Sequence, residues 1–190
     1  MKENNILAWL GLNPDDFNLK NRQFAHQSDL HGIAHVYRTM INVLWLAWLR
    51  QDAEYGRLAF FGAYVHDLAR VHDEYSETHG ADSVQRAMPL YEPLFTQYGV
   101  DKCQMNYIRE AVRQHAYPET LTPQDAGWMT LAMLKDADAL DRCRIGDLNV
   151  DYLRLPESLE LVDAAEQRFA ATGYATQECT FLEFIDRCCQ

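Results

Sequence analysis

Hydrophobic residues recur three and four positions apart along most of the chain, which is the spacing of a helix with one buried face. Across 31–51 this pattern makes a broad apolar stripe, formed by Ile33, Val36, Tyr37, Met40, Ile41, Leu44, Trp45 and Trp48. The following segment, 53–70, is apolar on nearly all sides. It therefore predicts a central helix that other helices surround.

Residues that begin or end helices divide the rest of the chain. Thr78, Thr122 and Pro156 suit the start of a helix, and Pro89 and Gly173 suit an end. The additional helices predicted by these signals cover 79–87, 101–115, 122–142, 156–172 and 179–188. The first 25 or so residues are expected to form an N-terminal helix and loop that pack on this bundle.

The sequence shows no sign of a β-sheet. No segment alternates hydrophobic and polar residues as a half-buried strand does, and no Asn-Gly or Asp-Gly hairpin turn occurs. There is also no internal repeat and no linker long enough to separate two domains. We therefore expect an all-α fold, a single-domain helical bundle spanning 1–190.

The charge of the chain narrows the range of partners. The sequence has 17 Lys and Arg against 28 Asp and Glu, a formal net charge of −11. Proteins that bind nucleic-acid polymers neutralise phosphates with clustered Lys and Arg, so this balance disfavours such a partner. A small phosphorylated substrate needs only a local cationic pocket or a metal ion, and it is still compatible with the sequence.

Cysteine usage and hydropathy indicate the expected compartment. The five cysteines include no C-x-x-C pair, which is typical of reduced thiols in a cytoplasmic protein. The longest unbroken apolar run, 43–49, is far shorter than the roughly 20 residues that cross a bilayer. We therefore expect a cytoplasmic protein without a membrane partner.

Histidines and aspartates recur along the predicted helices and carry the candidate chemistry. The pair His66-Asp67 interrupts the most apolar segment, where an unpaired carboxylate would be costly to bury. Either Arg70, one turn further on, or a bound metal could compensate its charge. Imidazoles and carboxylates that point inward from several helices are how a bundle builds a divalent-metal site. The groups in question are His31 and His35, His66 and Asp67, His79, His115, and Asp136, Asp138 and Asp141.

The same residues carry a resemblance to a known family. The order of HGIAHVYR, FFGAYVHDLAR and LKDADALDR is similar to the HD superfamily of metal-dependent phosphohydrolases, whose motif is His, then His-Asp, then Asp. The match covers about 28–145. The histidines of THGADS and AVRQHAY resemble the two extra histidines of dinuclear members. The resemblance implies an HD-type helical fold with one or two divalent metal ions, without distinguishing Mn, Fe, Ni, Co, Mg and Zn.

Two ligand assignments depend on this resemblance. His31 and His35 lie one helical turn apart, so either could reach a metal; the family pattern selects His35 and leaves His31 to support a ligand or face the substrate. Asp136 and Asp138 lie about 200° apart around a helix and cannot both face one ion. The resemblance favours Asp138. The implied metal ligands are His35, His66, Asp67 and Asp138, with His79 and His115 for a second ion.

Further residues are candidates for catalysis and substrate binding. Asp67 would bridge two ions, and Lys135, Arg38 and Arg70 are the cations expected to clamp a phosphate. Asp141 and Arg142 share a helix face with Asp138, and Lys135 lies one turn before it. For these three residues, either a solvated face with Lys135–Asp138 and Asp138–Arg142 ion pairs or a substrate role is open.

The resemblance favours a metal-dependent phosphohydrolase that acts on a small phosphorylated substrate, a nucleotide or a related phosphoester, through a metal-activated water. One alternative is a diiron oxygenase, because oxygenases of the myo-inositol oxygenase kind are similar in ligand order. Another is a non-catalytic regulatory HD module. The interpretation is compatible with a homodimer.

Overall fold

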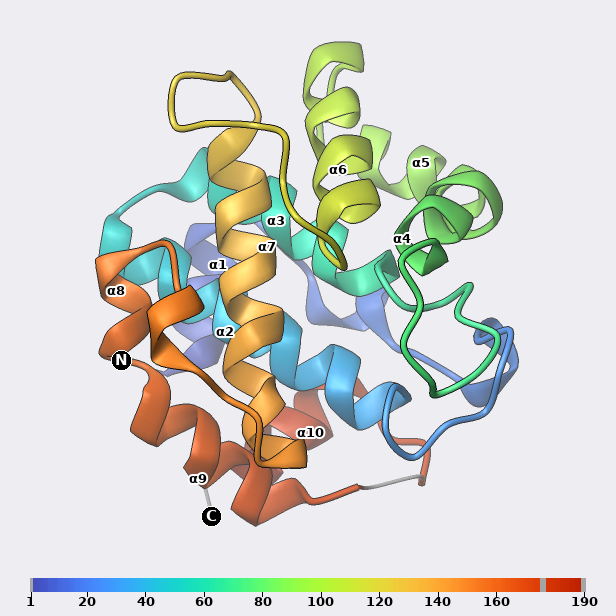
Figure 1. Ribbon diagram of the computed structural model, residues 1–190, viewed down its shortest axis with the longest axis vertical. Helices are drawn as coiled ribbons and strands as arrows, with labels where there is room; N and C mark the ends of the chain where they lie inside the picture. Colours follow the sequence, from blue (N-terminus) through green and yellow to red (C-terminus); the bar gives the residue numbers. More distant parts are fainter. Residues whose placement is uncertain (1, 175–176, 189–190) are drawn as a thin grey trace.

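The computed structural model describes residues 2–174 and 177–188, and within them it contains helices, turns and loops but no strand (Figure 1). This confirms the all-α prediction for the described part of the chain. The α-helices are α1 (Glu3–Trp9), α2 (Ile33–Arg50), α3 (Ala53–Val65), α4 (His79–Asp82), α5 (Met88–Gln97), α6 (Lys102–Gln114), α7 (Trp128–Leu140), α8 (Pro156–Leu159), α9 (Val162–Thr172) and α10 (Phe181–Cys188). No described helix has the length and hydropathy needed to cross a membrane.

Short irregular turns connect these helices. The 3₁₀ turns are η1 (Pro14–Phe17), η2 (Asn21–Gln23), η4 (Asp141–Ile145) and η5 (Val150–Tyr152), and η3 (Ser83–Ala87) is a π-helical turn. The turn η4 directly continues α7, and η3 joins α4 to α5. The hydrogen-bond spacing of the helix therefore changes at η4, which begins with Asp141, and at η3, which follows the helix that begins with His79.

Four helices form the centre of the molecule: α2 packs on α3 and α7, and α3 packs on α6 and α7. In Figure 1, α7 runs down the middle with α2 and α3 behind it. Helices α2 and α3 approach each other closely at Gly56, where an added Cβ would lie 2.2 Å from the Cβ of Ala47. Glycine is needed there because any side chain would push the two helices apart.

Aromatic side chains attach the two ends of the chain to this centre. Phe17 in η1 contacts the ring of Phe60 on α3 edge-on, with 5.0 Å between centroids. The ring centroid of Tyr37 on α2 lies 5.0 Å from that of Phe181 and 5.2 Å from that of Phe184, both on α10. The N-terminal segment and the C-terminal helices therefore cover α2 and α3 on the side away from α6.

Helix α3 is shorter than the sequence pattern predicts. It ends at Val65, and the chain continues in turns in which Leu68 donates to the carbonyl of Val65 and Arg70 to that of Asp67. The His66-Asp67 pair therefore lies at the end of the apolar helix and not inside it. Both residues are buried there.

Four other helix boundaries also differ from the prediction. Pro89 does not end a helix, because it lies in the first turn of α5, where no backbone donor is required. Helix α7 begins at Trp128, since Thr122 and Asp125 bond to each other in a separate turn. The predicted helix 156–172 is divided into α8 and α9. The last predicted helix, 179–188, begins later in the structure, as α10.

Candidate metal centre

Six buried or half-buried ligand groups come together in the middle of the four central helices. His35 comes from α2, His66 and Asp67 from the turn after α3, His79 from the first residue of α4, His115 from the C-terminal end of α6, and Asp138 from α7. They are far apart along the chain, and only the fold brings them together. Groups of them lie close enough together to hold a metal ion.

Backbone carbonyls orient three of the imidazoles in the same way. The Nδ1 atoms of His66, His79 and His115 each donate to the carbonyl oxygen three residues earlier, at 2.7, 2.8 and 2.7 Å. A carbonyl oxygen can only accept, so in the neutral rings of His66 and His115 the proton is on Nδ1, and Nε2 presents a lone pair to the interior, as a metal ligand must. At His79 the Nη1 of Arg70, which can only donate, also lies 3.0 Å from Nδ1, so Nδ1 has a second possible partner there.

His35 is held by a carboxylate instead. Its Nδ1 donates to Oδ2 of Asp141 at 2.7 Å, and Nε of Arg38 donates to the other oxygen of Asp141 at 2.5 Å. Nη1 of Arg144 lies 3.4 Å from Asp141 Oδ2. Carboxylates of this kind fix the tautomer and the ring plane of a ligating histidine. Asp141 is therefore a buried residue that positions His35, and the solvated face considered for it is wrong.

The Nε2 atoms face one another in two pairs. His35 and His66 have their Nε2 atoms 3.1 Å apart, and His79 and His115 have theirs 2.8 Å apart. Two lone pairs at such a distance repel unless a proton or another cation lies near them. Each pair therefore forms a site that favours a cation.

Asp67 lies between the two histidine pairs. Its Oδ2 is 3.5 Å from Nε2 of His35 and 3.8 Å from Nε2 of His66. Its Oδ1 is 3.3 Å from Nε2 of His79 and 3.7 Å from Nε2 of His115. One carboxylate thus offers a separate oxygen to each pair. We call the groups subsite A (His35, His66, Asp138 and Asp67 Oδ2) and subsite B (His79, His115 and Asp67 Oδ1).

The unsatisfied atoms support a metal at these subsites. Asp67 Oδ1 is buried, and no described residue makes a hydrogen bond to it. Asp138 Oδ1 approaches subsite A at 3.4 Å from Nε2 of His35. Buried carboxylate oxygens without a donor are costly, and nitrogen and oxygen donors together suit first-row divalent metals. The residues present therefore fit one or two divalent ions, whose identity the donors do not decide.

The electrostatics favour the metal-binding protonation state at four of the ligands, but at His35 they favour the protonated ring, which must lose its Nε2 proton to bind a metal. Burial lowers the pKa of His66 to about 3 and that of His79 to about 4. Burial opposes ionisation of Asp67 and Asp138, but the surrounding imidazoles outweigh it and hold the pKa of both carboxyls below the ordinary range. Burial also opposes a charge on His35, whose hydrogen bonds to Asp141 and Asp67 raise its pKa overall.

His31 supports Asp67 from the solvent side. Its Nδ1 donates to Asp67 Oδ2 at 2.9 Å, and its side chain is 14% exposed. Burial lowers the pKa of His31, against the effect of Asp67. His31 therefore orients the central carboxylate and also faces the cavity above it, which combines the two roles considered for it.

A cavity of about 840 Å³ opens over the centre. His31, Asp67, His79, His115 and Asp138 lie among the residues that line it. Its wall also carries the cationic side chains of Arg70, Lys135, Arg142, Arg144 and Arg154. The chain as a whole is strongly acidic, so this concentration of cations around one cavity makes its potential unlike that of the rest of the molecule.

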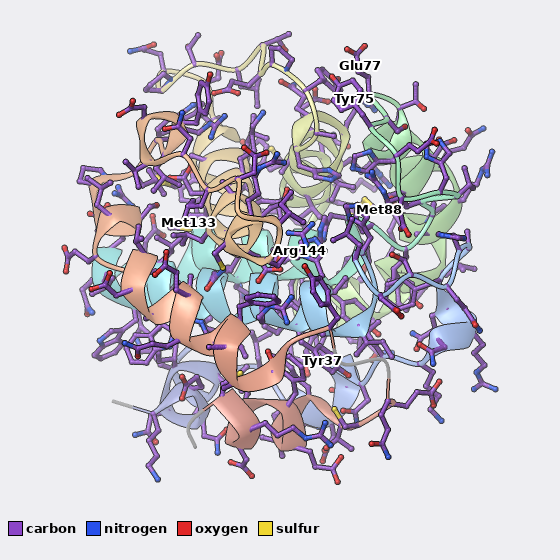
Figure 2. All side chains as sticks on the ribbon, turned by 60° about the horizontal axis from the view of Figure 1, so that its bottom comes forward. Tyr37, Tyr75, Glu77, Met88, Met133 and Arg144 are labelled. Carbon is purple, nitrogen blue, oxygen red and sulfur yellow. The ribbon has the colours of Figure 1, made fainter. Side chains whose placement is uncertain are left out.

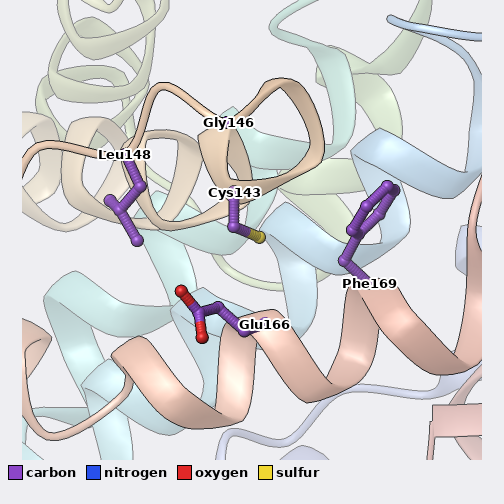
Figure 3. A pocket seen from close by; sticks show the side chains of 5 residues that line it. All are labelled: Cys143, Gly146, Leu148, Glu166 and Phe169. Carbon is purple, nitrogen blue, oxygen red and sulfur yellow. The ribbon is translucent and has the colours of Figure 1, made fainter.

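Arg38 does not line this cavity, so its expected role as a phosphate clamp is wrong. It is buried, its Nη1 donates to the carbonyl of Gly173 at 2.8 Å, and the ring of Phe169 lies 5.2 Å from its guanidinium carbon. A separate, smaller cavity of about 320 Å³ is lined by residues that include Phe169 and Cys143 (Figure 3). Arg38 therefore acts on the centre through Asp141.

Arg70 lines the cavity but is largely occupied. It donates to the carbonyls of His72 at 3.0 Å and Glu74 at 2.6 Å, and its Nη1 lies 3.0 Å from Nδ1 of His79. The ion pair with Asp67 that the sequence left open is not formed among the described residues. Arg70 holds the loop 71–78 over subsite B, and Tyr75 of this loop extends to the edge of the molecule (Figure 2).

Two aspartates of α7 are separated as their spacing requires. Asp136 is buried away from the histidines and accepts from the backbone of Arg154 and Leu155 and from Oγ of Ser158 at 2.7 Å. Asp138 faces subsite A. Asp136 therefore anchors the start of α8, and Asp138 is the aspartate available to a metal.

Several cavity residues were not singled out from the sequence. Arg144 and Arg154 follow α7 in turns and Glu119 precedes it in a loop, where no helical period indicates a face. Arg142, which the sequence analysis did single out, lines the cavity as well and pairs with Asp147 at the surface. The only signal in the sequence was the number of arginines after Asp141.

Comparisons of the chain with protein-family models, with curated proteins and with solved structures find no match. The geometry of the centre and its cavity is therefore the basis for assigning a function.

Proposed function

We propose that this protein is a metal-dependent phosphohydrolase of the HD type that uses two divalent ions to hydrolyse a small phosphorylated substrate. The observation that carries the proposal is the position of Asp67, which offers one oxygen to each of two histidine pairs on the floor of a cationic cavity. The order of these residues along the chain, His, His-Asp, His, His and Asp, supports the HD assignment.

The charge of the centre suits a phosphate. With Asp67 and Asp138 ionised and the imidazoles bound as neutral ligands, two divalent ions would leave a net charge of about +2 on this group of residues. A phosphomonoester dianion would neutralise that charge. The cationic wall of the cavity, which includes Arg142 and Arg144, would bind the remaining phosphoryl oxygens.

The chain's own residues would perform the positioning steps. A divalent ion in such a site supplies Lewis acidity and lowers the pKa of a water. The carbonyl bonds at Nδ1 keep the imidazoles aimed inward, and the bond from Asp141 does the same for His35. His31 holds Asp67 in place and presents its edge to the cavity, where it could move a proton to or from a leaving group.

The first test combines metal analysis with a screen for phosphate release. Protein purified without chelator is analysed for bound metal and then assayed on nucleotides and sugar phosphates with added Mn, Fe, Ni, Co, Mg or Zn. We expect about two metals per chain and phosphate release from at least one small substrate. Asp67→Asn should lose both, whereas Asp163→Asn, which removes an exposed carboxylate on α9, should retain both.

The outcome also distinguishes the alternatives. Tightly bound iron with oxygen-dependent turnover and no phosphate release would favour a diiron oxygenase. A folded protein that binds no divalent metal on titration would favour a regulatory helical module. Either result would reject the hydrolase.

A further inference from the structure

One carboxylate on the cavity wall is bound by two cations. Glu119, in the loop between α6 and α7, accepts from Nε of Arg154 at 2.8 Å through one oxygen and from Nη2 of Arg154 at 2.9 Å through the other. Nζ of Lys135 lies 2.9 Å from the second oxygen. This is a two-point arginine contact with a lysine added, the arrangement with which proteins bind phosphate and carboxylate groups.

Groups other than Glu119 already fix the position of Lys135. Its Nζ also donates to the carbonyl oxygens of Gln114 at 3.1 Å and Tyr117 at 2.5 Å, so Glu119 accounts for the third of its three donors. Lys135 comes three residues before Asp138 on α7 and therefore shares its face of the helix. The ammonium group thus lies about one helical turn from a ligand of subsite A.

Arg154 is also held independently of Glu119. Its Nη1 donates to buried Asp136 at 3.2 Å and to the carbonyl of Tyr152 at 2.9 Å. Its backbone nitrogen donates to the same aspartate. The edge of the guanidinium formed by Nε and Nη2 is the part that faces Glu119. If the carboxylate of Glu119 left, both cations would keep their places and present free donors to the cavity.

Glu119 is the more movable partner. Its side chain is 26% exposed, against 8% for Lys135, and it comes from a loop and not from a helix. Hydrogen bonds from Arg154 lower the pKa of Glu119 to about 2, so it is an anion at neutral pH. An anion from solution could therefore replace it and leave Lys135 and Arg154 neutralised.

We infer that Lys135 and Arg154 form a second anion-binding subsite, which takes a second phosphoryl group of the substrate and which the carboxylate of Glu119 fills in its absence. The inference rests on the proposed function, because it assumes that the first phosphoryl group lies at the metal centre. It extends that function by naming the substrate class: small molecules with two phosphoryl groups.

The competition with Glu119 favours a phosphoryl group over a carboxylate. A tethered carboxylate is present at a high effective concentration, so a singly charged group from solution gains little by replacing it. A phosphoryl group carries up to two negative charges and three acceptor oxygens, which match the donors of an arginine and a lysine. Glu119 therefore selects for doubly phosphorylated molecules by excluding weaker anions.

Binding of phosphonates, which cannot be hydrolysed, tests the inference without relying on turnover. The full-length protein as purified is titrated with methylphosphonate and with a series of bisphosphonates whose two groups are joined by one to six methylene units. For at least one bisphosphonate, Glu119→Gln should raise the affinity about tenfold, and it should leave methylphosphonate within about twofold. Arg154→Gln should remove the advantage of that bisphosphonate.

A matched control separates this effect from a simple change of charge. Glu92→Gln removes the same charge from a comparable pair, in which Arg109 donates to Glu92 at 2.6 Å outside the cavity. Glu92→Gln should change neither the affinity for methylphosphonate nor that for the bisphosphonate. Because Arg154→Gln removes a contact to a buried aspartate and could unfold the protein, Glu119→Lys serves as a second variant: a third cation should tighten bisphosphonate binding in the same direction.

The result also distinguishes failure of this inference from failure of the proposed function. If no bisphosphonate binds more tightly to Glu119→Gln than to the unaltered protein, the subsite is wrong, whatever the hydrolase assay shows. If the bisphosphonate preference is present but no phosphate is released from any substrate, the subsite stands and the hydrolase is wrong.

Discussion

The replacement Asp141→Asn tests the support of the metal centre most directly. Asp141 is 1% exposed and accepts from His35, from Nε of Arg38 and from Nη2 of Arg38 at 3.2 Å. Asparagine keeps the shape of the side chain but removes its charge and one of its acceptors. The change therefore leaves a buried guanidinium without its counter-ion and His35 without a fixed tautomer.

The magnitude follows from the burial of this pair. Breaking a buried ion pair by neutralising one partner costs about 3–5 kcal/mol, and the remaining amide oxygen of asparagine can keep one hydrogen bond, so we expect a loss near the lower end, about 3 kcal/mol. Removing a carboxylate that orients a ligating histidine lowers metal affinity by about 10- to 100-fold. Subsite A should therefore weaken while Asp67 and Asp138 are unchanged.

Urea unfolding of the metal-free protein and titration with Mn²⁺ measure the two effects separately. Asp147→Asn is the matched control, since Asp147 pairs with Arg142 at the surface with 60% of its side chain exposed. An exposed pair contributes about 0–1 kcal/mol, and this variant should bind metal normally. If Asp141→Asn unfolds at the same urea concentration as the Asp147→Asn control and binds Mn²⁺ as tightly, the support that we assign to Asp141 is refuted.

Three more predictions use other parts of the site. Asp138→Asn should lower metal affinity with little loss of stability. Asp136→Asn should instead lower the free energy of unfolding in urea by about 2–3 kcal/mol, because it loses bonds to the start of α8, and it should leave metal binding intact. Equal loss of metal binding in both variants would contradict the separation of the two residues. Stripping metal with a chelator should lower the melting temperature, and Mn²⁺ at 100 times its dissociation constant should restore about 2.7 kcal/mol, a gain that Asp67→Asn should not show. Because the pKa of Glu119 falls from its ordinary 4.5 to about 2, the stabilisation that this carboxylate contributes is complete above pH 4.5 and disappears as the pH falls to 2. In urea unfolding, Glu119→Gln should be less stable than the unaltered protein at pH 7 and closer to it in stability at pH 3. An equal difference in stability at both pH values would disprove the linkage.

The helical class and the central helices could be predicted from the sequence because they follow from local spacing. The stripe across 31–51 corresponds to α2, and the segment 101–115 corresponds to α6, where Asp101 and Gln104 cap the first turn. Burial alone did not reveal where α3 ends, since the apolar pattern continues to Ala69 while the backbone changes to turns after Val65. Helix ends depend on which carbonyls find other partners, and hydrophobicity carries no signal for that.

The candidate metal ligands could be named from the sequence, but the residues that support them could not. Their spacing of three residues showed correctly that Asp138 and Asp141 share a helix face. In the structure both carboxylates contact the imidazole of His35, Asp138 at Nε2 and Asp141 at Nδ1. Spacing could not show that this face lies against α2, because the partner of a face is set by tertiary packing. A solvated interpretation was therefore as consistent with the sequence as the buried one.

The roles of the arginines and the lysine at this site could not be predicted from spacing either, because they too depend on tertiary packing. Arg38 is close to the ligands along the chain, yet it is used to neutralise Asp141, because a carboxylate that orients a buried imidazole needs its own counter-ion. The cations that face the cavity come from α7 (Lys135), from the turn after α3 (Arg70) and from the turns after α7, and among them Arg154 and Lys135 already hold an anion, Glu119. Burial alone does not separate the two roles, because Arg70, Lys135 and Arg144 line the cavity although they are 5–8% exposed. The partner of each cation decides its role: a cation bonded to Asp141 supports a ligand, and a cation bonded to a movable carboxylate on the cavity wall can exchange that carboxylate for another anion.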